Sequence, residues 1–321
     1  MKTTLMLVAA TALSLVLPGL VLGFQEAEPN VPANEQVYIP FRWNQGDSRK
    51  FRITESKSQR KGETTKQGNG SVRDIELEVV EKSEKGLVVS WRLGIESAKG
   101  VAPADPVSKE IMKIYSGLKI RVQIDGEGVY QGVQNWEEID AANQKLKAIL
   151  KQVVQDIDLP REQKQAVWNA TMKRYGSRQA IEAKMTEPLQ LLVTMTNCEF
   201  AKKGIEEYET QVPYLGKTLP ASERYSVASL DAKNQLVKID WAREIDQEKS
   251  QPLIEQAMAE LAKELGKENP QPESLKGYLV SSTGQYEIDL KTGWPVKIVL
   301  EHTAGPESSL SIRTLTIESR K

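Results

Sequence analysis

The sequence feature that most constrains this fold is an alternation of apolar and polar side chains that recurs along much of the chain. Apolar residues occupy every second position across residues 75–79, 89–95, 286–290 and 296–300. Such alternation is typical of strands that bury one face of a sheet. Because short turns rather than helices separate most of these segments, we expect the strands to be antiparallel.

The centre of the chain follows a different period. One apolar stripe has the i, i+3, i+4 spacing of a helix and consists of Leu146, Ile149, Leu150, Val153, Val154 and Ile157. A second helix is expected from Pro160, a third across residues 180–185, and either a fourth helix or a buried strand from Pro188. Another amphipathic helix is expected across residues 253–265.

These patterns together predict an α+β fold. Its sheet is expected to be antiparallel, curved and half-barrel-like, with about ten strands and with helices packed on one face. Because strands lie near both ends of the chain, the C-terminal strands are expected to complete the same sheet. Residues 38–321 are therefore predicted to form a single α+β domain with a helical block at about 136–197.

The N-terminus has the pattern of a secretory signal peptide. Lys2 precedes an apolar run from Leu5 to Leu17, Pro18 ends the run, and short side chains lead to Gly23. Residues 1–23 are therefore predicted to be a signal peptide cleaved after Gly23, followed by a polar linker at residues 24–37. An uncleaved membrane anchor is the alternative. The protein is expected to be exported, periplasmic or extracellular, and soluble after cleavage.

Composition excludes several classes of protein. The chain has 321 residues, 43 basic and 44 acidic side chains, one Cys and one His. One Cys cannot close an intrachain disulfide, and one Cys with one His cannot supply a zinc site. The nearly neutral charge disfavours binding to nucleic acid. Because no phosphate-binding Gly-rich motif is present, we expect no cofactor.

The few residues with catalytic or metal-binding potential have simpler interpretations. His302 has no accompanying nucleophile motif and is expected to be a solvated residue at a strand end. Asp125, Asp231 and Asp289 each begin a polar turn, where calcium binding is the alternative to ordinary turn chemistry. Cys198 is expected to be an inert, buried or half-buried thiol. We therefore predict no catalytic residue, no metal site and no enzymatic activity.

A basic segment is the one candidate contact surface. As a hairpin it would protrude and could touch anionic lipid headgroups or acidic envelope polymers. Its candidate residues are Arg49, Lys50, Arg52, Lys57, Arg60 and Lys61. The favoured interpretation is that these charges protect an edge strand from aggregation, and surface contact is the alternative.

One resemblance adds to this interpretation. The hairpin YEIDLKTGWPVKI at residues 286–298, together with the signal peptide and the opening β-meander, resembles a group of uncharacterised exported bacterial proteins. More loosely, the order of elements resembles the lipoprotein-carrier fold of the bacterial envelope. That resemblance implies a curved sheet that wraps around helices and encloses an apolar groove for acyl chains.

The sequence therefore favours a non-enzymatic exported protein that binds a lipid or other apolar ligand, or an envelope partner, through a curved sheet. One alternative is a hydrolase whose carboxylates converge only in three dimensions. The other is a structural or assembly factor of the envelope that works through its basic hairpin.

Overall fold

The computed structural model describes residues 35–68, 70–94, 110, 113–114, 118–264 and 268–320. The expected signal peptide and all but the last three residues of the expected linker lie outside this part of the chain.

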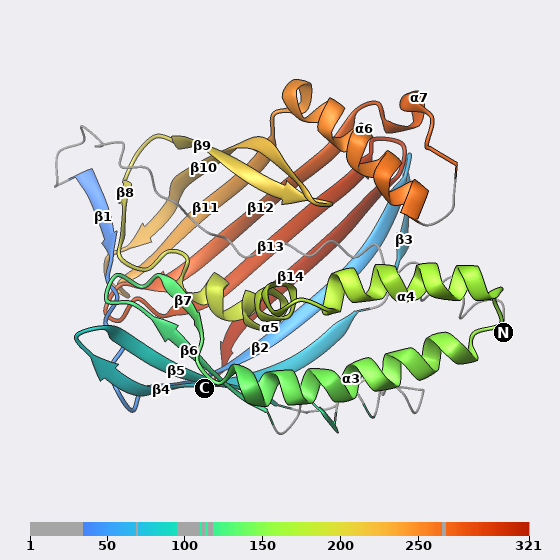
Figure 1. Ribbon diagram of the computed structural model, residues 1–321. Helices are drawn as coiled ribbons and strands as arrows, with labels where there is room; N and C mark the ends of the chain where they lie inside the picture. The colour runs from blue at the N-terminus through green and yellow to red at the C-terminus, as the bar shows by residue number, and fades with distance from the viewer. Residues whose placement is uncertain are drawn as a thin grey trace.

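A twelve-stranded antiparallel sheet dominates the described structure (Figure 1). Eleven strands form its continuous path, in the spatial order β7 (Tyr130–Val133), β6 (Lys119–Ile124), β5 (Gly86–Gly94), β4 (Ser71–Ser83), β2 (Ser48–Lys61), β14 (Leu310–Arg320), β13 (Pro295–Pro306), β12 (Tyr278–Asp289), β11 (Leu236–Ile245), β10 (Lys217–Asp231) and β9 (Glu206–Tyr214). The twelfth strand, β3 (Thr64–Gln67), pairs with the far end of β2. A separate two-stranded sheet joins β1 (Gln36–Ile39) to β8 (Cys198–Ala201).

The sheet is completed by strands from opposite ends of the chain. Ile53 of β2 lies opposite Ile317 of β14 in the antiparallel register. The predicted α+β class and the predicted joining of N-terminal and C-terminal strands are therefore confirmed. The expected number of about ten strands is too low, partly because β3 lies in a polar segment without apolar alternation.

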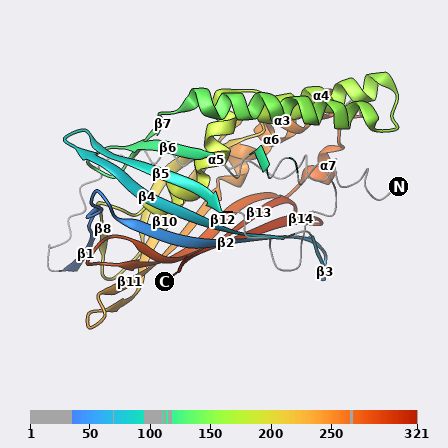
Figure 2. The same ribbon diagram turned by 90° about the horizontal axis from the view of Figure 1, so that it is seen from below.

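Alternation defines two faces of the sheet. The inner face carries the buried residues of the main apolar cluster, including Phe51, Ile53 and Ile75, and the helices lie on this side (Figure 2). On the same face Gly284 is required, because a Cβ there would overlap Leu300 and press against Trp241. The outer face, opposite the helices, is polar and partly exposed.

Five helices are described: α3 (Trp136–Asp156), α4 (Arg161–Tyr175), α5 (Arg178–Val193), α6 (Gln247–Glu264) and the single turn α7 (Pro272–Leu275). The expectation that a new element begins at Pro188 is wrong, because α5 continues through this proline. All five residues from Leu189 to Val193 are buried, and this burial outweighs the roughly 3 kcal/mol cost of an interior proline. No helix in the described ranges is both long and apolar enough to cross a membrane.

Two apolar clusters lie on the inner face. The larger cluster joins α5 to the central strands and contains the stacked rings of Trp43 and Trp294, whose centroids are 3.6 Å apart. The smaller cluster lies under α6 and includes Ile254 of that helix with Leu219 and Val280 of the sheet. The helices therefore cover two separate apolar areas of one sheet.

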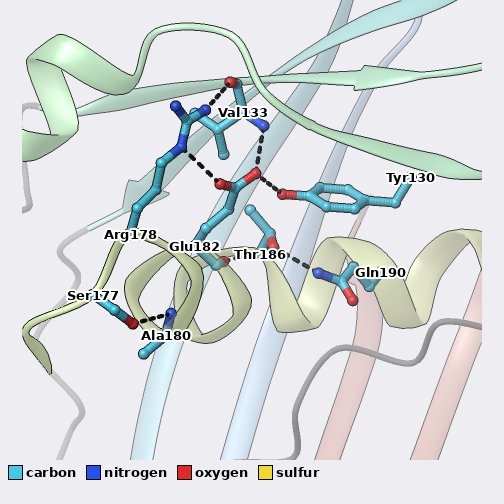
Figure 3. A network of polar contacts seen from close by, with 8 residues as sticks. All are labelled: Tyr130, Val133, Ser177, Arg178, Ala180, Glu182, Thr186 and Gln190. Carbon is cyan, nitrogen blue, oxygen red and sulfur yellow. Dashed lines mark hydrogen bonds and ion pairs between the residues drawn. The ribbon is translucent and has the colours of Figure 1, made fainter. Parts of the chain in front are cut away.

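Helix α5 is fixed to strand β7 by one carboxylate (Figure 3). Glu182 Oε1 accepts hydrogen bonds from the Tyr130 hydroxyl and the Val133 backbone N–H, each 2.7 Å long. Arg178 lies 3.4 Å from Glu182 Oε2 and stacks over Trp136. These contacts set the position of α5 above the sheet.

Candidate functional site

A row of polar side chains crosses the inner face and separates the two apolar clusters. The cross-strand register places its members side by side on six successive strands: Lys57 (β2), Arg313 (β14), His302 (β13), Ser282 (β12), Arg243 (β11) and Glu223 (β10). We call these six residues the polar row. Charged groups at buried positions are costly unless they are paired, so each contact in the row matters for stability.

At the β10–β11 end of the row, Arg243 and Glu223 form a buried ion pair. Arg243 Nε lies 2.7 Å from Glu223 Oε1, and the two side chains are only 9% and 5% exposed. Tyr225 donates a hydrogen bond to the second carboxylate oxygen of Glu223, and the Arg243 guanidinium lies over the Trp241 ring. Both charges are therefore satisfied within the protein.

The middle of the row holds a buried serine–histidine pair. Ser282 Oγ and His302 Nδ1 are 2.9 Å apart, and His302 is 7% exposed. The expectation of a solvated His302 at a strand end is wrong, because β13 continues to Pro306 and buries the ring. Burial, reinforced by the charges of Arg313 and Arg243, lowers the pKa of His302 to about 4. The imidazole is therefore neutral at neutral pH.

This pair lacks the third member of a nucleophilic triad. A hydrolytic serine needs a histidine whose second nitrogen is oriented by a carboxylate. His302 Nε2 is buried, and within the described ranges it has no hydrogen-bond partner. The arrangement is that of a cross-strand polar contact rather than of an activated nucleophile.

At the β2–β14 end of the row, several charged side chains surround Arg313. Its guanidinium bonds to both oxygens of Glu187 on α5, at 2.7 and 3.0 Å, and to both oxygens of Glu55 on β2, at 3.1 and 3.5 Å. Burial alone would lower the pKa of Arg313, but Glu187 and Glu55 outweigh burial and raise it. Arg313 thus joins α5, β2 and β14.

Two further cations approach the same carboxylates. Lys57 Nζ lies 3.4 Å from Glu55 Oε1, and its side chain is 38% exposed. Arg73 on β4 lies opposite Ile53, and its Nε is buried with no hydrogen-bond partner in the described chain. Burial alone would raise the pKa of Glu55, but Arg313, Lys57 and Arg73 together lower it.

Strand alternation divides the predicted basic segment between the two faces of β2. Three of its residues lie on the same face of β2 as Phe51, the inner face: Arg49, Lys57 and Lys61. The other three lie on the outer face: Lys50, Arg52 and Arg60. Arg49 stacks over Trp294, and Arg52 forms a bidentate pair with Asp74 at 2.7 Å. Only Lys57 of the six belongs to the polar row.

Sequence reasoning missed most of the residues that meet here. Their common signal is a charged residue at an inward position of an alternating strand: Glu55, Arg73, Glu223, Arg243 and Arg313 all show it. Glu187, on a helix, shows no such signal.

The three aspartate turns are ordinary turns. Asp125 accepts from the backbone N–H groups of Glu127 and Val129, and Asp231 accepts from Asn234. Asp289 likewise accepts from its own turn. Across the described residues, no group of three or more His, Cys, Asp or Glu side chains could hold a metal ion.

Cys198 is half-buried, as the sequence predicts. Burial, with a smaller effect of the Glu206 charge, raises the pKa of its thiol to about 12. The thiol is therefore protonated at neutral pH and a poor nucleophile.

Two open depressions mark the surface. One, of about 500 Å³, lies mainly on the outer face and is lined by Arg224, Asp240 and Glu301 among others. The other, of about 400 Å³, lies beside α3 and includes Ala141, Ala142 and Lys145. Neither includes a member of the polar row.

Comparisons with known proteins place the chain in no family. No protein-family model matches it, and no curated protein gives a significant match. Among solved structures, one described as lipid–protein interactions in lipovitellin has a TM-score of 0.42 and 8% sequence identity. The match covers 87% of this chain and 25% of that chain, so this chain spans about a quarter of its length. A likeness of this size does not establish a shared function.

Proposed function

We propose that the protein is an exported, non-catalytic binding protein that holds an apolar ligand between the inner face of the sheet and the α3–α4 hairpin. The observation that carries the proposal is the incomplete burial of this hairpin. Its two helices form a layer above the sheet (Figure 2). Several of their apolar side chains are only half-buried, although Ile139, Leu146 and Val154 of α3 are buried.

The hairpin differs sharply from α5. None of the described side chains of α4 is fully buried, and Val167, Trp168 and Met172 remain half-buried. On α3, Leu150 and Val153 are also half-buried. The principal contacts of α3 are with α4, whereas the end of α5 packs fully into the main apolar cluster.

Apolar surface that a protein keeps partly exposed is a common mark of a binding site. A flexible acyl chain fits such a surface, because it can lie along a stripe without requiring a rigid pocket. The resemblance of the sequence to the lipoprotein-carrier fold implies the same type of ligand. Export of the chain rests on the signal-peptide pattern of residues 1–23.

Binding of a fluorescent long-chain alcohol by the purified full-length or signal-cleaved chain tests this proposal. Val153→Asp places a charge on the half-buried stripe and should weaken binding about tenfold or more, because a carboxylate resists burial beside an acyl chain. Gln152→Asp adds the same charge at an exposed neighbouring position and should leave binding unchanged.

A lack of binding by the wild-type chain would contradict the proposal. So would mass spectrometry of protein purified from its own host that shows a bound envelope protein and no lipid. Labelling of Ser282 by a fluorophosphonate would also contradict the non-catalytic part of the proposal, because only an activated serine reacts with that probe.

A further inference from the structure

The charges around Arg73 are unevenly matched. Three cations, Arg73, Arg313 and Lys57, face two carboxylates, Glu55 and Glu187, in the described structure. The difference, 3 − 2, leaves this cluster one positive charge in excess. A partly buried cluster of this kind favours one additional negative charge.

The excess charge resides on Arg73 rather than on Arg313. Arg313 makes four hydrogen bonds, one to each oxygen of the two carboxylates. Arg73 interacts with the same carboxylates through charge, while its buried Nε–H has no acceptor in the described chain. Burial lowers the pKa of Arg73, and the attraction of Glu55 and Glu187 does not offset it.

Apolar side chains flank Arg73 on the inner face of the sheet. Its neighbours on the inner face, Ile53 and Ile75, are buried apolar residues of the main cluster. Part of the Arg73 surface stays accessible, and Lys57, the outermost cation, is 38% exposed. A polar group could therefore approach from the Lys57 side while an apolar chain lies along the sheet.

We propose that Arg73 binds the head of a singly charged anionic amphiphile, a fatty-acid carboxylate or a lipid phosphodiester. Its planar guanidinium matches the oxygen pairs of both groups, and a buried bond of this type is strong. The acyl chain of the same molecule lies against the half-buried stripe of α3 and α4. This inference rests on the proposed function, because it specifies the head group of the same ligand.

The test compares a fluorescent long-chain fatty acid with the alcohol of the same chain length. The wild-type chain should bind the acid about tenfold more tightly, which is the effect of one charge-assisted contact. Arg73→Met should bind acid and alcohol equally, and Arg73→Lys should keep part of the preference. Arg92→Met removes an exposed arginine of the neighbouring strand β5 and should behave as wild type.

Displacement of the probe separates the two head groups. Stronger displacement by a long-chain fatty acid assigns the site to a carboxylate, and stronger displacement by a single-chain phosphatidylglycerol assigns it to a phosphodiester. Equal binding of acid and alcohol by the wild type, or a preference retained by Arg73→Met, would overturn the inference while the proposed function stands. Failure of the wild type to bind either probe would overturn both.

The melting temperature distinguishes a binding role from a structural one. Because the buried Nε–H of Arg73 has no acceptor among the described residues, Arg73→Met should melt at or above the wild-type temperature. A clear fall in its melting temperature would assign Arg73 a structural role and would overturn the inference.

Discussion

At the scale of single residues, burial decides what each polar group can do. His302 is buried and Cys198 is half-buried, and burial holds both in their neutral forms. Two carboxylates accept hydrogen bonds from Arg313, whereas the buried Nε of Arg73 has no acceptor in the described part of the chain. The same residue type thus serves structure at one position and remains available for binding at another.

His302 should make stability depend on pH. Its pKa falls from about 6.5 in the unfolded chain to about 4 in the folded protein, so the unfolded chain binds more protons between these values. Stability is therefore complete above pH 6.5 and falls as the pH decreases toward 4, by about 3 kcal/mol. Chemical denaturation at several pH values measures this slope.

His302→Gln is the control, because glutamine can bond to Ser282 and does not titrate. Its stability should change little between pH 6.5 and 4. Glu55 titrates at lower pH, since its folded pKa is lowered and its contribution is lost only as the pH falls through that value. An unchanged slope in His302→Gln would show that another group causes the pH dependence.

At the scale of elements, alternation in the sequence was a good guide to strands but not to the site. It located the strands whose inward residues are apolar, such as β4, β12 and β13. It missed β3, whose four residues are all exposed, and it ended α5 too early at Pro188. Tertiary burial, which local sequence does not encode, decided the extent of α5.

The polar row could not be assembled from sequence for a related reason. Each inward charge was visible on its own strand, but its partners depend on the cross-strand register. Arg313 and Glu55 are 258 residues apart, and only the pairing of β14 with β2 brings them together. Conversely, the basic side chains that follow one another closely in the sequence lie on opposite faces of β2, so they do not form one continuous surface.

The position of α5 should depend on the single carboxylate of Glu182. Replacing it with alanine leaves the Val133 N–H and the Tyr130 hydroxyl without their acceptor, which should cost about 1–3 kcal/mol of unfolding free energy. Glu182→Gln keeps an oxygen at the Oε1 position and should lose less than half as much. Equal losses for the two variants would show that charge, rather than the acceptor, fixes the helix.

At the scale of the whole molecule, the protein combines a strongly connected sheet with a loosely packed layer. Pairing of β2 with β14 joins the two ends of the described chain, so the sheet forms as one long-range unit. The α3–α4 hairpin contributes Ile139 and the half-buried Trp136 to the larger apolar cluster, while Leu146 and Val154 of α3 are buried outside both clusters. Such a division is compatible with the proposed function, in which the sheet supplies a fixed surface and the ligand lies beneath the hairpin.

Hydrogen exchange should report this division directly. The backbone amides of β2 and β14 should be the most protected, because opening them breaks the centre of the sheet, while those of α4 should exchange by local opening at much lower free energy. A bound amphiphile that contacts the stripe should slow exchange in α3 and α4 and leave β9 unchanged, since β9 lies at the far edge of the sheet. Equal protection of α4 and β14 in the ligand-free protein would mean that the hairpin is part of the rigid core. Ligand-induced protection confined to β9 would place the ligand away from the hairpin.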